Sequence, residues 1–303
     1  MEIPFCLWSP FEIKFQALVA FRMDASGKKG AMSTLRQSTS EIAAAGLSRA
    51  EIDAFARDGY VAVPGFLSID DVNRVRRWVG DVERWPDRRG AGWLQHDEQT
   101  GGGVRRTRTE NFSPFHDELR ALLTAGAVPA MAGQLLGEPA VLYKEKINYK
   151  HPGGAGFAAH QDAPAYPHIN VSVSCLLVVD DSTVDNGCLE FVGGLYHELL
   201  PTDGDGCIRP DIAEALQWLA HPARAGSLVW FHSHTPHRSG PNTSHTSRRA
   251  LYLTYNGASA GDCHETYYRD KRAALSAAVN DGETQRVSLI GHFRGIAPVR
   301  PNK

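Results

Sequence analysis

The spacing of apolar residues changes near residue 140, from a period of about 3.6 to a period of 2. After this point, short alternating runs separated by Gly and Pro turns predict strands at residues 141–150, 171–179, 188–192, 227–232 and 249–255. Many short strands after a helical lead predict a closed or sandwiched antiparallel sheet with helices packed outside it. We therefore expect a mainly β fold with flanking helices, and 303 residues are enough for a jelly-roll barrel of this kind to bury its own core.

Capping signals predict helices on both sides of this change. Ser48 and Glu51 form a capping box for a helix that ends near Asp58 and Gly59, and Ser68 with Asp71 opens another that runs toward Trp78. Further helices are expected from Ser113-Pro114 to Gly126 and at residues 128–136 and 265–279. Residues 87–103, rich in Gly, Asp and Arg, are expected to form a lid or a disordered tract.

Length and charge set the class of protein. The chain has 303 residues, a formal net charge of −2 and no internal repeat or linker-like stretch. We expect a single domain at residues 46–303, preceded by an extension at residues 1–45 that is either disordered or an overextended start. No basic field attracts nucleic acid and no stretch approaches the roughly twenty apolar residues of a membrane span, so we expect a small-molecule partner. The sequence does not indicate an oligomeric state.

The cysteines indicate a reducing compartment. Their number is odd, five, and none has Cys-x-x-Cys spacing. Such a pattern favours buried thiols over a disulfide framework, and we expect a cytoplasmic protein.

Histidine and aspartate residues form a candidate metal site. His160 and Asp162 are two positions apart in a predicted strand, residues 157–166, and would project from the same face. A third ligand would come from the downstream histidines, among which His237 lies in a connection between strands, while His232 and His234 compete with it. Two histidines and one carboxylate leave half of an octahedral ion open, which suits Fe(II), O2 and an oxidisable co-substrate.

These motifs resemble the phytanoyl-CoA dioxygenase family of Fe(II)- and 2-oxoglutarate-dependent oxygenases. The matching pieces lie between about residues 50 and 256: Asp58-Gly59-Tyr60, residues 63–68, residues 144–148, His160-Gln161-Asp162, the element from His237 through Ser239 to Asn242, and an arginine that opens the next strand. The resemblance implies a double-stranded β-helix, a cupin-like barrel.

The resemblance also implies roles for single residues. His160, Asp162 and His237 would bind Fe(II), and Arg248 would pair with the far carboxylate of 2-oxoglutarate, because a guanidinium offers two parallel donors. Arg249 is the competitor, since strand alternation places the two arginines on opposite faces. Ser239 and Gln161 would lie close to the co-substrate, unless they are ordinary turn and strand polarity.

The substrate is less closely defined. Lys144, Lys146 and Asn148 share one face of a predicted strand, with Arg108 upstream, and would bind an acidic substrate if that face lines the barrel mouth; a solvated charged face is the alternative. The most concrete expectation is 2-aminoethylphosphonate. A CoA thioester, an amino acid derivative and a secondary metabolite are the alternatives within the family.

Two other classes of protein compete with an oxygenase. One is a cupin-like metal protein with another chemistry, and the other is a non-catalytic scaffold. Arg248 after His237 favours 2-oxoglutarate chemistry, and the carboxylate of Asp162 favours hydroxylation over halogenation. We therefore expect a hydroxylase that uses Fe(II), 2-oxoglutarate and O2.

Overall fold

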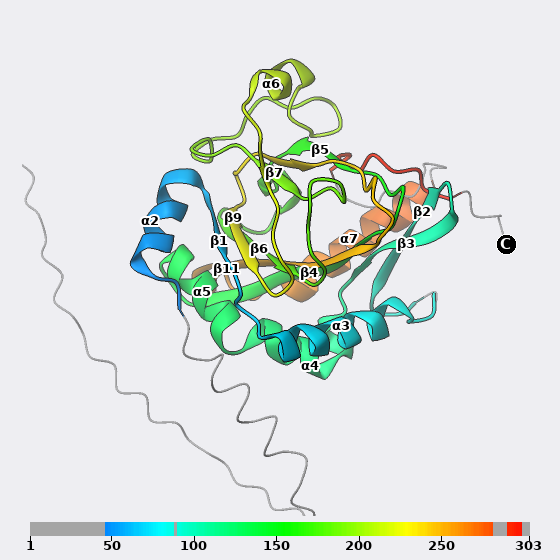
Figure 1. Ribbon diagram of the computed structural model, residues 1–303, viewed down its shortest axis with the longest axis horizontal. Helices are drawn as coiled ribbons and strands as arrows, with labels where there is room; N and C mark the ends of the chain where they lie inside the picture. Colours follow the sequence, from blue (N-terminus) through cyan, green and yellow to red (C-terminus); the bar gives the residue numbers. More distant parts are fainter. Residues whose placement is uncertain (1–45, 88–89, 281–289, 299–303) are drawn as a thin grey trace, which may run out of the picture. The chain divides into compact units, whose positions relative to one another are not determined.

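Two antiparallel sheets form the body of the protein in a computed structural model (Figure 1) that describes residues 46–87, 90–280 and 290–298. The larger sheet has the strand order β1-β9-β6-β11-β4-β3-β2 and the smaller sheet β5-β10-β7-β8. The strands are β1 (Tyr60–Val63), β2 (Leu94–Thr100), β3 (Gly103–Glu110), β4 (Ala140–Lys150), β5 (Phe157–His160), β6 (Ser172–Val178), β7 (Leu189–Phe191), β8 (Leu219–His221), β9 (Leu228–His232), β10 (His237–Ser239) and β11 (Arg248–Gly257). The expected mainly β, double-stranded β-helix architecture is confirmed. The extension at residues 1–45 lies outside the described residues, and the single domain at 46–303 stays a prediction.

Helices cover one face of the larger sheet, and the smaller sheet faces the other (Figure 1). They are α2 (Arg49–Asp58), α3 (Ile69–Glu83), α4 (Asp117–Thr124) and α5 (Ala127–Leu136), with α6 (Pro210–Ala215) and α7 (His264–Asn280) elsewhere in the body. The capping box of Ser48 and Glu51 and the left-handed Gly59 (φ 79°) bound α2 as predicted. Ser68 caps α3, which runs past Trp78 to Glu83.

The predicted helix from Ser113 to Gly126 is wrong at its start. Residues Ser113–Phe115 form a 3₁₀ turn, and His116 caps a separate helix, α4, that ends at Thr124. Gly126 then takes a φ of 77° and separates α4 from α5. The stretch Asp117–Leu136 is long and apolar enough to cross a membrane by length and composition, which the sequence analysis overlooked. Its division into two helices with buried residues, among them Leu119, Leu123 and Met131, identifies it as part of the core.

Because side chains alternate between the two faces of a strand, the larger sheet has two separate buried faces. On β6, Val173, Cys175 and Leu177 pack against the helices, together with Leu251 and Leu253 of β11. Their neighbours Leu176 and Val178 face the smaller sheet and pack with Leu189, Phe191 and Phe231. The larger sheet is therefore apolar on its helix-covered face, while its other face is free to carry polar groups toward the smaller sheet.

The segment at residues 87–103 is not the predicted lid or disordered tract. Beyond residues 88–89, which lie outside the described residues, it contains β2, which pairs with β3 from Leu94 opposite Glu110 to Thr100 opposite Gly103. Buried charged and polar side chains at His96 and Glu98 hid this strand, because they break the apolar alternation that identifies a strand. The hairpin forms one edge of the larger sheet.

Candidate active site between the two sheets

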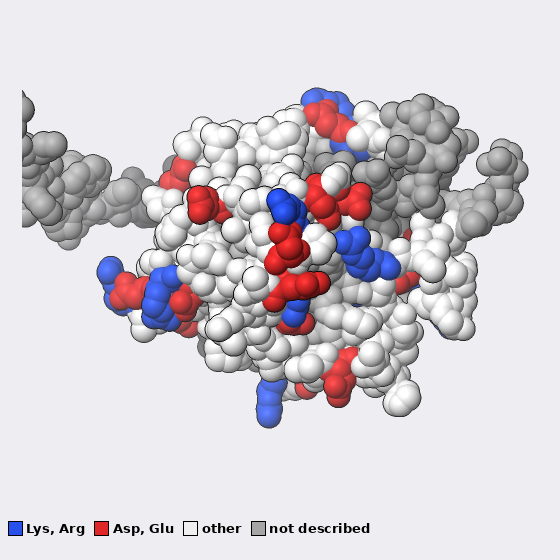
Figure 2. Space-filling view, turned by 90° about the horizontal axis from the view of Figure 1, so that it is seen from above, with Lys and Arg blue, Asp and Glu red and all other residues white. Residues whose placement is uncertain are grey.

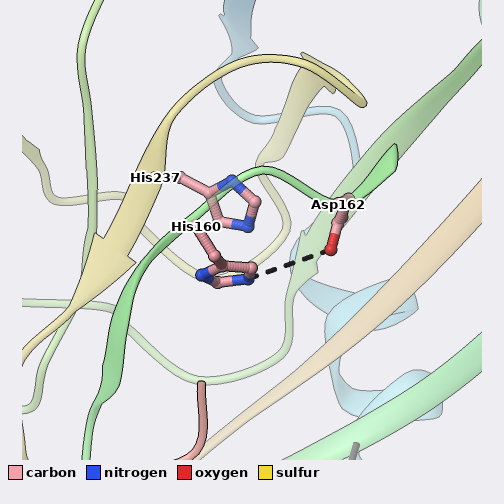
Figure 3. A group of neighbouring side chains, drawn as sticks. All are labelled: His160, Asp162 and His237. Atoms are coloured by element: carbon pink, nitrogen blue, oxygen red, sulfur yellow. Dashed lines mark ion pairs between the residues drawn. The ribbon is translucent and has the colours of Figure 1, made fainter. Parts of the chain in front are cut away.

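His160, Asp162 and His237 converge in the interior of the barrel (Figure 3). One nitrogen or oxygen atom of each lies within 4.8 Å of those of the other two, and all three residues are buried. His160 and His237 are direct partners in the antiparallel pair of β5 and β10, with ring centroids 4.1 Å apart. Strand pairing thus brings together candidate ligands that are far apart in the sequence.

Asp162 reaches the group by a different route from the one expected. β5 ends at His160, so the predicted strand over residues 157–166 is too long. Asp162 has helical backbone angles (φ −74°, ψ −30°) and precedes a 3₁₀ turn, Ala163–Ala165. The turn brings its carboxylate to 3.9 Å from His160 Nε2. Strand alternation was therefore the wrong reason for a correct prediction that the two side chains meet.

Backbone carbonyls fix the orientation of both imidazoles. His160 Nδ1 lies 2.7 Å from Ala158 O, and His237 Nδ1 lies 2.9 Å from Thr235 O. A carbonyl only accepts hydrogen bonds, so each Nδ1 carries the hydrogen and each Nε2 keeps its lone pair. Two bare nitrogens and one carboxylate form a donor set that fits a divalent metal ion.

The environment of the barrel interior keeps these three side chains in the protonation states that bind a metal ion. Burial raises the pKa of Asp162, but neighbouring basic groups, namely His237 and His160 when protonated in acid together with Lys144 and Lys146, outweigh burial and hold that pKa below its ordinary value. Burial also lowers the pKa of both His160 and His237. At neutral pH the group therefore contains a carboxylate and neutral imidazoles, the forms that bind metal ions.

The competing histidines lie elsewhere. His232 is at the end of β9, where its Nδ1 accepts a hydrogen bond from the backbone N–H of His234, 3.1 Å away. The rings of both contact each other and Tyr196 contacts His232, and neither belongs to the possible metal-binding group among the described residues. The geometry selects His237.

Arg248 is the arginine that faces the interior. It is only 2% exposed, its Nη2 donates to Gly187 O at 2.7 Å, and its buried Nε has no hydrogen-bond partner within the described part of the chain. A buried donor without a partner is costly, so this atom marks a place where an acceptor fits. Arg249 points the other way and pairs with Asp180.

Lys150 and Ser239 lie beside Arg248. Lys150 is the direct β4 partner of Arg248, and its Nζ donates to Ser239 Oγ at 2.9 Å and to Gly240 O at 2.7 Å. Ser239 thus accepts from the lysine and keeps its own hydrogen to donate. Gly187 completes the cluster, because a Cβ at its φ of 73° would lie 2.3 Å from Gly240 O and 2.7 Å from Lys150 Nζ. Lys150 Nζ also donates to Gly187 O at 3.2 Å, so its three donors are in use, and the Arg248 guanidinium with the Ser239 hydroxyl is left to suit one end of a dicarboxylate.

Gln161 does not fit its expected role. Its Nε2 donates to Glu198 O at 2.9 Å and to His234 O at 2.6 Å, and its Oε1 accepts from Leu200 N at 2.7 Å. The side-chain amide therefore fastens two loops behind the candidate metal group. It is not available to hold the carboxylates of a co-substrate.

Basic side chains from β4 face the same interior. Lys144 and Lys146 lie close enough to Asp162 to lower its pKa, and their ammonium groups lie over aromatic rings: Lys144 Nζ is 4.1 Å from the centroid of Tyr166, and Lys146 Nζ is 5.0 Å from that of Tyr252. Neither ammonium makes an ion pair or hydrogen bond with any described residue. The expected alternative of a solvated charged face does not hold for this strand.

Asn148 and Arg108 continue this face. Arg108 of β3 is paired in register with Asn148, and its Nε donates to Asn148 Oδ1 at 2.9 Å. Glu110, two residues along, is held by Lys271 of α7 at 2.6 and 2.7 Å. The structure thus brings all four predicted substrate-binding residues onto one surface of the barrel interior.

Two residues of the interior were missed by the sequence analysis. Lys150 continues the alternation of Lys144, Lys146 and Asn148, and that pattern was sufficient to find it. His292 stacks on His160 with ring centroids 3.9 Å apart. It comes from the last twenty residues, where no motif or periodicity marks it.

The chain resembles known proteins along most of its length. Residues 55–250 match the family model for phytanoyl-CoA dioxygenase (PhyH). The chain is 46% identical over 253 residues to a methylphosphonate hydroxylase of Gimesia maris, covering 82% of this chain and 96% of that protein. It is 38% identical over 224 residues to a 2-aminoethylphosphonate dioxygenase of an uncultured bacterium, covering 71% of this chain and 84% of that protein.

Solved structures share the fold. The crystal structure of EctD from S. alaskensis with 2-oxoglutarate and 5-hydroxyectoine has a TM-score of 0.62 at 19% identity and covers 71% of this chain and 77% of that chain. The non-heme alpha-ketoglutarate-dependent carbocyclase SnoK has a TM-score of 0.58 at 26% identity and covers 70% of this chain and 85% of that chain.

Proposed function

The chain belongs to the phytanoyl-CoA dioxygenase family and is a dioxygenase that uses iron and 2-oxoglutarate, and from this premise we propose that it hydroxylates a C–H bond of a small phosphonate. Methylphosphonate is the first candidate substrate. The proposal includes the roles of single residues: His160, Asp162 and His237 bind Fe(II), while Arg248 and Ser239 bind the far carboxylate of 2-oxoglutarate. Once bound, iron and 2-oxoglutarate activate O2, so that one oxygen atom enters the substrate and the other enters succinate as CO2 leaves.

Lys144 and Lys146, two basic groups without an ion-pair partner among the described residues, support the choice of an anionic substrate. Burial lowers the pKa of Lys144 to about 8, and burial together with the charges of Arg108 and Lys144 lowers the pKa of Lys146 well below its ordinary value. A dianion placed between these groups would relieve their repulsion and supply the missing partners. On the face seen in Figure 2, by contrast, basic and acidic side chains are interspersed.

The carboxylates near Lys144 and Lys146 are already engaged, and this favours methylphosphonate over 2-aminoethylphosphonate, the substrate expected from the sequence. The amino group of the latter is a cation and needs an acidic partner. Among the described residues of this surface, Glu110 is already bound by Lys271 and lies 3.3 Å from His96 Nε2, while Asp162 is proposed as a metal ligand. An uncharged methyl group needs no such partner. The 46% identity to a methylphosphonate hydroxylase supports the same order.

The second candidate is 2-aminoethylphosphonate itself, which the 38% identical relative supports. Binding of its ammonium group would require Glu110 to exchange Lys271 for the substrate. The free thiols of Cys175, Cys188, Cys207 and Cys263 suit a reducing compartment, and a cytoplasmic location is part of the proposal.

Substrate-dependent release of succinate tests the function. Protein loaded with Fe(II) and 2-oxoglutarate under air would be given methylphosphonate, 2-aminoethylphosphonate, or acetate as a carboxylate control. We expect methylphosphonate to give the highest rate, with the hydroxylated phosphonate detected by ³¹P NMR. Succinate release that no phosphonate raises above the substrate-free level would overturn the proposal. Release raised by a CoA thioester or an amino acid derivative instead would assign the chain to another substrate class of the family.

A further inference from the structure

His292 is a buried histidine whose ring nitrogens have no role in the proposed function. The residue is 2% exposed, and neither Nδ1 nor Nε2 has a hydrogen-bond partner within the described part of the chain. A neutral imidazole always carries one N–H donor and one bare nitrogen. Leaving both buried without partners costs free energy on the order of 1–3 kcal/mol per group. Such a residue calls for a ligand that supplies the partner.

The segment that carries His292 is held in place by its backbone. His292 O accepts from Ala158 N at 2.8 Å, Arg294 N donates to Gly156 O at 3.1 Å, and Gln99 N donates to Ile296 O at 2.7 Å. These bonds attach the segment to β5, an edge of the smaller sheet, and to β2, an edge of the larger sheet. The position of the backbone at residue 292 therefore does not depend on the imidazole.

The ring of His292 lies at the metal group but is not part of it. It stacks on His160 at an interplanar angle of 10°, and its ring centroid lies 5.4 Å from that of Phe157. The group of described residues that could share a metal ion contains His160, Asp162 and His237 and does not include His292. Lys146 and Arg108 are near enough that their charges, after burial and that of His160, lower the pKa of His292. The ring thus contacts the candidate metal group and is also close to basic side chains of β3 and β4.

We propose that His292 is a substrate-binding residue whose ring N–H donates a hydrogen bond to an oxygen of the phosphonate. This inference rests on the proposed function. Lys144, Lys146 and Arg108 approach from the larger sheet, whereas His292 stands on the edge of the smaller sheet. A phosphonate group has three oxygens arranged as a tripod, so donors from two sides satisfy it better than donors from one. A planar carboxylate gains less from the second side.

Two variants separate this role from simple packing on His160. His292→Phe keeps a flat aromatic ring against His160 but removes the donor. His292→Gln keeps an N–H donor but removes the stacked ring. His245→Phe, at an exposed histidine, is the control.

The measurement is calorimetric binding of methylphosphonate, without oxygen, to protein loaded with Fe(II) and 2-oxoglutarate. We expect the Kd to rise about 10- to 100-fold in His292→Phe, the range for loss of a hydrogen bond to a charged group. His292→Gln should recover most of the affinity, and iron content and 2-oxoglutarate affinity should match wild type in both. Three results would each overturn the role of His292: an unchanged Kd in His292→Phe, an equal loss of methylphosphonate affinity in both variants, or a loss of iron in His292→Phe. Absence of phosphonate binding by the wild type would instead overturn the proposed function, and the inference with it.

Discussion

Arg248 and Arg249 are consecutive residues of β11, yet their guanidinium groups lie on opposite faces of the larger sheet. Arg248 points into the barrel beside Lys150, whereas Arg249 donates to both carboxylate oxygens of Asp180 on the outside, at 2.7 and 3.0 Å. The first has a donor left for an anion that enters from the interior. The second already has its anion.

Replacement of Arg248 by lysine should weaken 2-oxoglutarate binding. Lysine keeps the charge but not the planar pair of donors, and loss of a charge-assisted bond costs about 1.5–3 kcal/mol, or roughly 10- to 100-fold in Kd. Binding of 2-oxoglutarate to the Fe(II) protein under argon measures this. Arg249→Lys is the matched control, and if it alone weakens binding, the proposed role belongs to Arg249.

Replacement of Asp162 by alanine should abolish iron retention and turnover. The candidate metal group then loses its only carboxylate and keeps two neutral imidazoles. Iron content after loading and desalting, together with succinate release, measures the effect. Asp211→Ala, at an exposed aspartate, should retain both. A fully active Asp162→Ala protein would contradict the ligand assignment.

Replacement of Lys144 or Lys146 by methionine should weaken substrate binding without loss of stability. Each lysine is a buried basic group beside an aromatic ring, with no carboxylate of the described residues paired to it, so its replacement by an apolar side chain of similar length is expected to be neutral or stabilising. We expect the KM for the phosphonate to rise about 10-fold or more and the Tm to stay level or rise. Arg105→Gln, on the exposed part of β3, serves as control. Lower Tm with unchanged KM would show that these lysines are structural.

His264 should make the stability depend on pH. Burial lowers its pKa, but the hydrogen bond and charge of Glu145, 2.8 Å away, outweigh burial and raise it. A raised pKa in the folded state stabilises the protein fully below the unfolded value of about 6.5, and this stabilisation is lost as the pH rises through the folded value.

The test compares wild type with His264→Gln by urea unfolding between pH 5.5 and 8.5. We expect wild type to be more stable by about 1–2 kcal/mol at the acid end, and this difference to shrink toward the alkaline end. His245→Gln, at an exposed histidine, should show no such trend. A difference that is constant with pH would mean that the protonated form of His264 is not what pairs with Glu145.

The sequence predicted the helices and strands that have clear capping residues or a clear pattern of apolar residues. α2 follows its capping box, and β4, β6, β9 and β11 follow clear alternation or apolar runs. β2 was missed because its inward residues, such as His96 and Glu98, are polar, and periodicity of apolar residues cannot detect them. β5 was predicted too long because the 3₁₀ turn Ala163–Ala165, which contains Pro164, was taken as part of the strand.

The residues of the candidate site likewise divide into those that the sequence could predict and those that it could not. His160, Asp162 and His237 could be predicted because short motifs contain them, and Lys150 because it extends an alternation. His292 could not, since only the pairing of its backbone with Ala158 brings it to His160. The opposite error occurred at Gln161, which lies between two candidate ligands in sequence but bonds away from them.

Strand β4 carries Lys144 near the candidate iron ligands and Lys150 beside Arg248, on the same face. The two lysines are six positions apart, about 20 Å of extended backbone. One strand in the interior of the larger sheet therefore fixes the spacing between the side chains proposed to bind the substrate and Arg248, which is proposed to bind 2-oxoglutarate. Loops around the barrel can change and admit other substrates, but that spacing changes only if β4 slips against β11, which would misplace both anchors at once.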